Sequence, residues 1–246
     1  ELDRDLDAWL AAGVPPEIEV AILPADPAAI DVRPLSPGEI RLVDLRLEIY
    51  RLGSKINGFG DAVDAWSSLT SRTKEIVTAH PDDRVVGLFA AKMMLLADIG
   101  EITSDEIGAM LDPAATGPED RILQARLMTR RADEGPPAEF HRTITAARAT
   151  LDDVLRANPD NVDALVAMFE NIRQEEGASP AATAYLAKAL AIDPANAEWR
   201  MTLLELYMRD QRKAEAIALL RTIVNLPHAG TESRMAADLL RKLTTG

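Results

Sequence analysis

The sequence predicts an all-α fold built of repeated helical hairpins, and three observations lead to that prediction. Apolar residues recur at intervals of three and four, as at Leu165, Met168 and Phe169, which is the period of a helix buried on one face. Capping residues that start helices recur along the chain. Prolines recur 32, 46, 35 and 33 residues apart, at Pro81, Pro113, Pro159, Pro194 and Pro227.

The first 40 residues differ from the rest of the chain in charge and in proline content. They hold nine acidic and two basic residues, in a chain of 246 residues whose net charge is −13. Six prolines lie from Pro15 to Pro37, and proline favours extended segments between helices. We expect a short helix over Leu2–Ala12 and an extended proline-rich linker over residues 13–35.

From Ser36 onward, helix starts follow one another. Ser36 and Glu39 have the spacing of a capping box with Pro37 at the first helical position, and Thr103 and Glu106 have the same spacing. These starts and the apolar period predict helices over residues 37–52, 59–79, 84–99, 104–111, 119–133, 138–157, 160–176, 180–191, 195–209, 212–225 and 230–243.

The same pattern, one small residue followed by two apolar residues, precedes each of Pro159, Pro194 and Pro227. Its distance from the proline is nearly the same in all three cases. A small residue at this place lets the two helices of a hairpin approach closely. The three sets are Ala147, Leu151 and Val154 before Pro159; Ala182, Leu186 and Ala189 before Pro194; and Ala216, Leu220 and Ile223 before Pro227.

A helical hairpin of about 34 residues closed by proline has the tetratricopeptide repeat (TPR) period. The chain resembles that family most clearly across residues 160–227 and also across 118–159. The resemblance implies a right-handed α-α superhelix, a TPR-like solenoid. We therefore divide the chain into the N-terminal helix and linker (1–35), diverged TPR-like hairpins (36–117), and TPR repeats (118–246). The last repeats end in a capping helix with Met235, Leu239, Leu240 and Leu243 on its apolar face.

A second resemblance concerns the N-terminal residues. Leu2–Leu10, the proline-rich linker and residues 32–37 are similar to a junction in bacterial proteins where a zinc-peptidase-like domain precedes a TPR region. This resemblance implies that the chain is a non-catalytic C-terminal accessory region of a longer enzyme. The chain also starts with Glu1 and not Met, so we expect that upstream residues were removed.

Composition argues against several classes of partner. A chain with this negative charge is repelled by nucleic-acid backbones and anionic membranes. The longest nearly apolar run, residues 85–97, is shorter than the roughly 20 residues of a membrane span. Without cysteine there is no disulfide framework. The compartment, cytoplasm or periplasm, and the oligomeric state stay open.

The sequence carries no pattern typical of an active site. His80, His141 and His228 lie 61 and 87 residues apart, and none belongs to the HExxH pattern of a zinc peptidase. Asn57–Gly60 lacks the Lys and the spacing of a phosphate-binding loop and suits a turn. We expect no enzymatic activity, no metal and no cofactor.

The candidate binding site lies on the first helix of each hairpin. It is the face of that helix that remains after the packing residues have been assigned. An acidic and apolar groove of this kind would suit a basic or amphipathic protein or peptide segment, bound in cis or in trans. It lacks the basic clamp with which some TPR proteins hold a C-terminal carboxylate. The alternatives are a solvated face with no partner, or a spacer or oligomerisation role. The predicted groove residues are Asp163, Val166, Glu170 and Arg173 in the helix over 160–176, and Glu198, Met201, Glu205 and Arg209 in the helix over 195–209.

Overall fold

The structure is a computed structural model that describes residues 33–245 apart from 54–58, 98–101, 178 and 226–229. The predicted N-terminal helix and most of the predicted linker lie outside the described residues. The chain divides into two compact units, Glu1–Leu35 and Ser36–Gly246.

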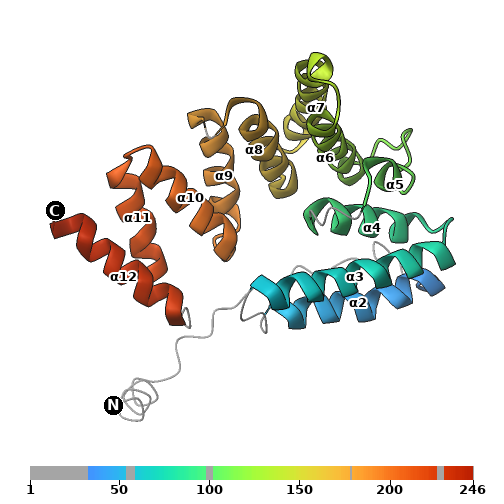
Figure 1. Cartoon of the computed structure of the whole chain (residues 1–246), viewed down its shortest axis with the longest axis horizontal. Helices are drawn as coiled ribbons and strands as arrows, with labels where there is room; N and C mark the ends of the chain where they lie inside the picture. Colours follow the sequence, from blue (N-terminus) through green and yellow to red (C-terminus); the bar gives the residue numbers. More distant parts are fainter. Residues whose placement is uncertain (1–32, 54–58, 98–101, 178, 226–229, 246) are drawn as a thin grey trace, which may run out of the picture. The chain divides into compact units, whose positions relative to one another are not determined.

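The described part of the second unit consists of helices joined by short turns and contains no strand (Figure 1). The all-α prediction is confirmed, and each helix predicted from Ser36 onward is present. The eleven helices are α2 (Pro37–Gly53), α3 (Phe59–Ala79), α4 (Arg84–Ala97), α5 (Ser104–Gly108), α6 (Pro118–Glu134), α7 (Pro137–Ala157), α8 (Val162–Glu176), α9 (Pro180–Ile192), α10 (Ala197–Arg209), α11 (Lys213–Val224) and α12 (Gly230–Thr245).

Side-chain caps set where several of the helices begin. The Ser36 amide donates to the Glu39 carboxylate at 2.8 Å, and the Glu39 amide donates back to the Ser36 hydroxyl at 3.0 Å. The Thr103 hydroxyl caps α5 in the same way. Two starts lie two residues later than predicted, because the side chains of Asn161 and Asn196 accept hydrogen bonds from the first turns of α8 and α10.

Helix α5 ends three residues earlier than predicted. The amide of Met110 donates to the Ile107 carbonyl at 3.1 Å, and that of Leu111 donates to the Gly108 carbonyl at 3.2 Å. These bonds span three residues and not four, so the chain tightens into turns before Pro113. The shortness of this helix is one way in which the first half departs from the later repeats.

The helices stack in pairs along the chain. Helix α6 packs on α7, α8 on α9, and α10 on α11, while α7 contacts α8 and α9 contacts α10. The first helices of neighbouring pairs also meet, since α6 contacts both α4 and α8. Helices α4, α6, α8 and α10 therefore follow one another as the first helices of consecutive hairpins.

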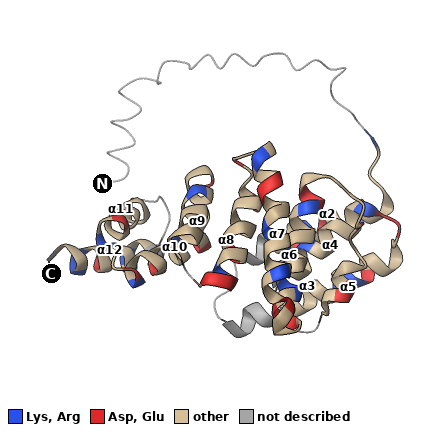
Figure 2. Cartoon of the chain, turned by 90° about the horizontal axis from the view of Figure 1, so that it is seen from above, with Lys and Arg blue, Asp and Glu red and all other residues tan. Residues whose placement is uncertain are grey.

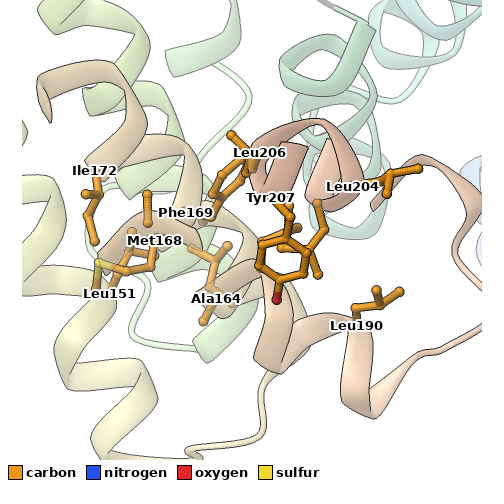
Figure 3. Close-up of a cluster of buried hydrophobic side chains, with 14 of the residues drawn as sticks. Leu151, Ala164, Met168, Phe169, Ile172, Leu190, Leu204, Leu206 and Tyr207 are labelled. Carbon is orange, nitrogen blue, oxygen red and sulfur yellow. The ribbon is translucent and has the colours of Figure 1, made fainter. Parts of the chain in front are cut away.

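The positions chosen from the proline spacing form the core of the second half. All nine are buried at 0–3% exposure, from Ala147 on α7 to Ile223 on α11. Leu203 and Tyr207 of α10 belong to the same cluster as Met168 and Phe169 of α8. Figure 3 shows how side chains of α7, α8, α9 and α10 converge in this core. The packing faces predicted for α8 and α10 are thus confirmed.

The apolar face of α12 was predicted with a wrong first residue. Met235 is 62% exposed, whereas Ala236 is buried, and Leu239, Leu240 and Leu243 pack against the core. Residues 236, 239, 240 and 243 share one face of a helix, because they follow the spacing of three, four and seven. Met235 lies one position away and points to solvent. The charged residues Arg234, Asp238, Arg241 and Lys242 are exposed.

A buried polar cluster fixes α8 against α6 and α7. The Asn171 amide is fully buried and donates to the Thr129 hydroxyl at 2.9 Å and to the Ile144 carbonyl at 3.2 Å. The guanidinium of Arg148 donates to the Asn171 side chain and to Glu175. Since a buried amide is costly to leave unpaired, these bonds favour one rotation of α8 about its axis. That rotation decides which α8 residues face α4 and α10.

Candidate functional site

Half of the predicted groove residues lie together in one pocket. The pocket has a volume of about 240 Å³ and is bounded by side chains from α4, α6, α8 and α10. Asp163, Val166 and Glu170 of α8 and Glu198 of α10 belong to its lining. The other lining residues are Lys92, Glu119, Ile122, Leu123, Arg126, Asn196 and Trp199.

Two of the four carboxylates in this pocket are already paired. Lys92 donates to Asp163 at 2.9 Å, which joins α4 to α8. Arg126 on α6 lies 2.6 Å from the Glu170 carboxylate. Glu119 and Glu198 make no ion pair within the described residues, so the pocket keeps an excess of negative charge. Across the unit as a whole, Figure 2 shows acidic and basic residues interspersed along the helices.

Glu170 is the most enclosed of these carboxylates. Burial raises the pKa of Glu170 above the ordinary value, the attraction of Arg126 opposes that rise, and repulsion from Glu198 adds to it. The side chain nevertheless keeps 35% of its surface exposed, which screens its ion pair. A further cation in the pocket would stabilise the charged form of Glu170 and lower its pKa.

Comparison with known proteins relates this region to a family of helical repeats. Residues 174–242, which include α9, α10 and α11, match the tetratricopeptide repeat family. This segment is similar to TPR repeats. The chain is also similar in structure to a thermophilic TPR protein of Thermus thermophilus, with a TM-score of 0.57 and 15% identity over 84% of this chain and 100% of that one. At that identity the likeness shows the fold alone. A comparison with curated proteins gives no match.

The TPR match supports a protein-binding role in general terms. It gives no support to the relation with zinc peptidases that the N-terminal residues suggested. Among the helices of the described residues, none has the length and apolar character needed to cross a membrane. The described residues also contain no cluster of three or more side chains able to hold a metal ion.

The other four predicted groove residues do not line this pocket. Arg173 is exposed, with its guanidinium 5.3 Å from the centre of the Phe169 ring. Met201, Glu205 and Arg209 follow one another along the exposed side of α10 beyond Glu198, and Arg209 contacts Asp210 at 2.8 Å. Helices α8 and α10 therefore present the predicted residues as a pocket followed by an open helix face.

Two predicted groove residues of α8 are less free than expected. Val166 is only 6% exposed and packs with Leu165 and Ala189 in a cluster that Trp199 of α10 also contacts. Glu170 lies outside the core clusters but is paired with Arg126, whose guanidinium lies 2.6 Å from its carboxylate. Helical periodicity alone could not reveal either contact, since both come from helices distant in sequence.

Sequence reasoning missed the residues that complete the pocket. Lys92 lies in the part of the chain where the resemblance to TPR weakens. Glu119 lies at the start of the predicted repeats, and Trp199 directly follows the predicted Glu198. The signal that could have found them is their place on the first helix of a hairpin. Applying the groove register to α4 and α6, as well as to α8 and α10, would have included Lys92 and Arg126.

Proposed function

We propose that this chain is a TPR-like scaffold whose groove along α4, α6, α8 and α10 binds a protein segment. The segment is basic or amphipathic and is bound in cis or in trans, without catalysis and without nucleic acid. The observation that carries this proposal is the pocket in which two carboxylates, Glu119 and Glu198, lack an ion pair among the described residues and lie beside an apolar wall. TPR regions are generally protein-binding scaffolds, which agrees with this assignment.

The charge of the pocket selects the chemistry of the partner. Four carboxylates face two basic side chains, Lys92 and Arg126, and both bases already contact a carboxylate. A Lys or Arg side chain of the partner would neutralise the remaining charge and would relieve the repulsion between Glu198 and Glu170. An acidic partner would increase that repulsion.

The apolar wall selects a partner that is not merely basic. Val166, Ile122 and Leu123 are buried or partly buried at the pocket, and the half-buried Trp199 ring lies between α8 and α10. An indole ring offers a large apolar surface and attracts a cation placed over its face. Together these features suit the aliphatic stem and charged head of one basic residue.

The experiment is a selection of random displayed peptides on the folded chain, followed by affinity measurements for the selected peptides. Glu198→Arg should weaken binding about ten-fold or more, and the loss should be greater at low salt than at high salt. The control is Glu75→Arg, which makes the same change at an exposed residue of α3 that belongs neither to the pocket nor to the predicted groove. Circular dichroism should give equal helicity for both variants.

Three outcomes would contradict the proposal. The first is that no peptide is selected. The second is that the selected peptides are acidic. The third is that their affinity falls equally with Glu75→Arg and Glu198→Arg. Self-association measured by light scattering, with loss of association in Glu198→Arg, would instead assign the groove to a second copy of this chain.

A further inference from the structure

A second pocket opens on α2 and α4 beside the first. Its volume is about 370 Å³, and most of its lining is apolar. Ile49 of α2 faces it together with residues of α4, and Arg46 lies at the same place with its guanidinium 5.1 Å from the centre of the Phe89 ring. The apolar residues of α4 that line it are Val85, Leu88, Phe89 and Met93.

The two pockets are neighbours in one groove. Lys92 of α4 and Glu119 of α6 line both of them. The shared residues connect an apolar pocket at α2 and α4 with the acidic pocket at α6, α8 and α10. The second pocket lies in the diverged hairpins, outside the segment that matches the TPR family and outside the groove predicted from the sequence.

We propose that the segment bound in the acidic pocket also places a bulky apolar side chain in this second pocket. This inference rests on the proposed function and adds a second recognition element to it. The partner is thus a segment with one apolar anchor, such as Leu, Met or Phe, and one basic residue at a fixed distance. The second pocket requires the apolar residue, and the acidic pocket requires the basic residue.

Size and lining fit an apolar side chain in the second pocket. An apolar cavity of about 150 Å³ can hold a benzene molecule, so this larger pocket accommodates one bulky side chain. Ile49, Val85, Leu88 and Phe89 are half-buried, which leaves apolar surface for a ligand to cover. Of its charged groups, Lys92 pairs with Asp163 and Arg46 lies over the Phe89 ring. Glu119, which lines both pockets, makes no ion pair among the described residues.

Helix packing sets the distance between the two anchors. Helices α4 and α8 each contact α6, and packed helices lie about 8–10 Å apart. The axes of α4 and α8 are thus separated by up to about 16–20 Å. An extended peptide advances about 3.3 Å per residue, so the apolar and basic anchors should be no more than about six residues apart.

The experiment uses the same displayed library and the same folded chain. Selected peptides should share an apolar and a basic residue at one separation. Replacing the apolar residue of a selected peptide with alanine should weaken its binding about ten-fold or more. Ile49→Trp, which fills the second pocket, should weaken the original peptide to a similar degree and leave the alanine peptide nearly unaffected.

Val43→Trp is the matched control, because Val43 is an exposed residue of α2 that does not line the pocket. Val85→Phe fills the pocket from α4 and replaces Ile49→Trp if that variant loses helicity. Peptides that respond to Glu198→Arg but to neither filling variant would overturn this inference and leave the proposed function standing. Failure to select any peptide would overturn both.

Discussion

At the scale of single residues, the closest contacts between helices depend on alanine. Ala147, Ala182 and Ala216 are each fully buried, and each lies in the second helix of its hairpin. A larger side chain at these places would have to displace the partner helix. The spacing of these alanines before proline therefore reflects a physical requirement, which is the close packing of the two helices in each hairpin.

Ala182→Leu should lower the free energy of unfolding by about 1–3 kcal/mol, because it overpacks a filled core. Ala184→Leu adds the same atoms on the same helix at an exposed position and should have little effect. Urea unfolding of the two variants checks the prediction. Equal midpoints would show that Ala182 does not face the contact between α8 and α9.

Glu175 should make stability depend on pH. Hydrogen bonding from His141 at 2.9 Å, together with Arg148, holds the pKa of Glu175 below its ordinary value of 4.5. A carboxylate whose pKa is lowered by folding stabilises the protein above its unfolded pKa, and that stabilisation is lost as the pH falls through the folded value.

The wild-type chain should therefore lose more stability than Glu175→Gln when the pH falls below about 4.5. Thermal unfolding at a series of pH values measures the difference. Glu205→Gln, at an exposed position on α10, is the comparison and should follow the wild type. Parallel curves for wild type and Glu175→Gln would contradict the assigned role of the contact.

At the scale of helices, α4 approaches the turn after α5 closely enough to require glycine. A Cβ atom built on Gly87 would lie 2.7 Å from the Met110 carbonyl oxygen, which is backbone and cannot rotate away. At Gly108 the nearest atom is the end of the Arg131 side chain, which can move. A side chain at Gly87 would therefore meet fixed backbone, whereas a side chain at Gly108 would meet a movable side chain.

Gly87→Ala should destabilise the fold by about 1–3 kcal/mol, although alanine is the better helix former by about 1 kcal/mol. Gly108→Ala should be close to neutral. Chemical denaturation of both variants decides the matter. A stabilised Gly87→Ala would mean that α4 and the turn at Met110 are further apart than the structure has them.

Local signals explain which helix boundaries could be predicted. Capping hydroxyls and prolines act within a few residues, so the starts of α2, α5 and α9 follow directly from the sequence. The faces of helices were harder to assign where a distant helix covers them. Met235 and Val166 show this, since only the packing of α12 and the position of Trp199 decide their exposure.

At the scale of the unit from Ser36 onward, the core is a series of clusters. One joins α2, α3 and α4, another joins α4, α5 and α6, and the largest extends from α6 to α12. This agrees with a repeat protein, in which each hairpin packs mainly on its neighbours. The second cluster crosses residue 117, and the division predicted there stays a prediction.

The groove is a property of several hairpins at once, which limits what the sequence could predict about it. Asp163, Val166, Glu170 and Glu198 were found because α8 and α10 keep the repeat pattern. Their partners Lys92 and Arg126 come from helices up to 71 residues away in the chain. Only the folded structure shows which carboxylates of the pocket are paired among the described residues and which are not.

The central claim, that a basic segment binds in the groove along α4 to α10, is tested most directly by the indole resonance of Trp199. Trp199 lines the acidic pocket, whereas Trp66 packs in the cluster of α2, α3 and α4 and lines neither pocket. Titration of a selected peptide in an NMR experiment should shift the Trp199 indole signal saturably and leave that of Trp66 in place. A peptide that binds with the same affinity while the Trp199 signal stays unchanged would contradict the account.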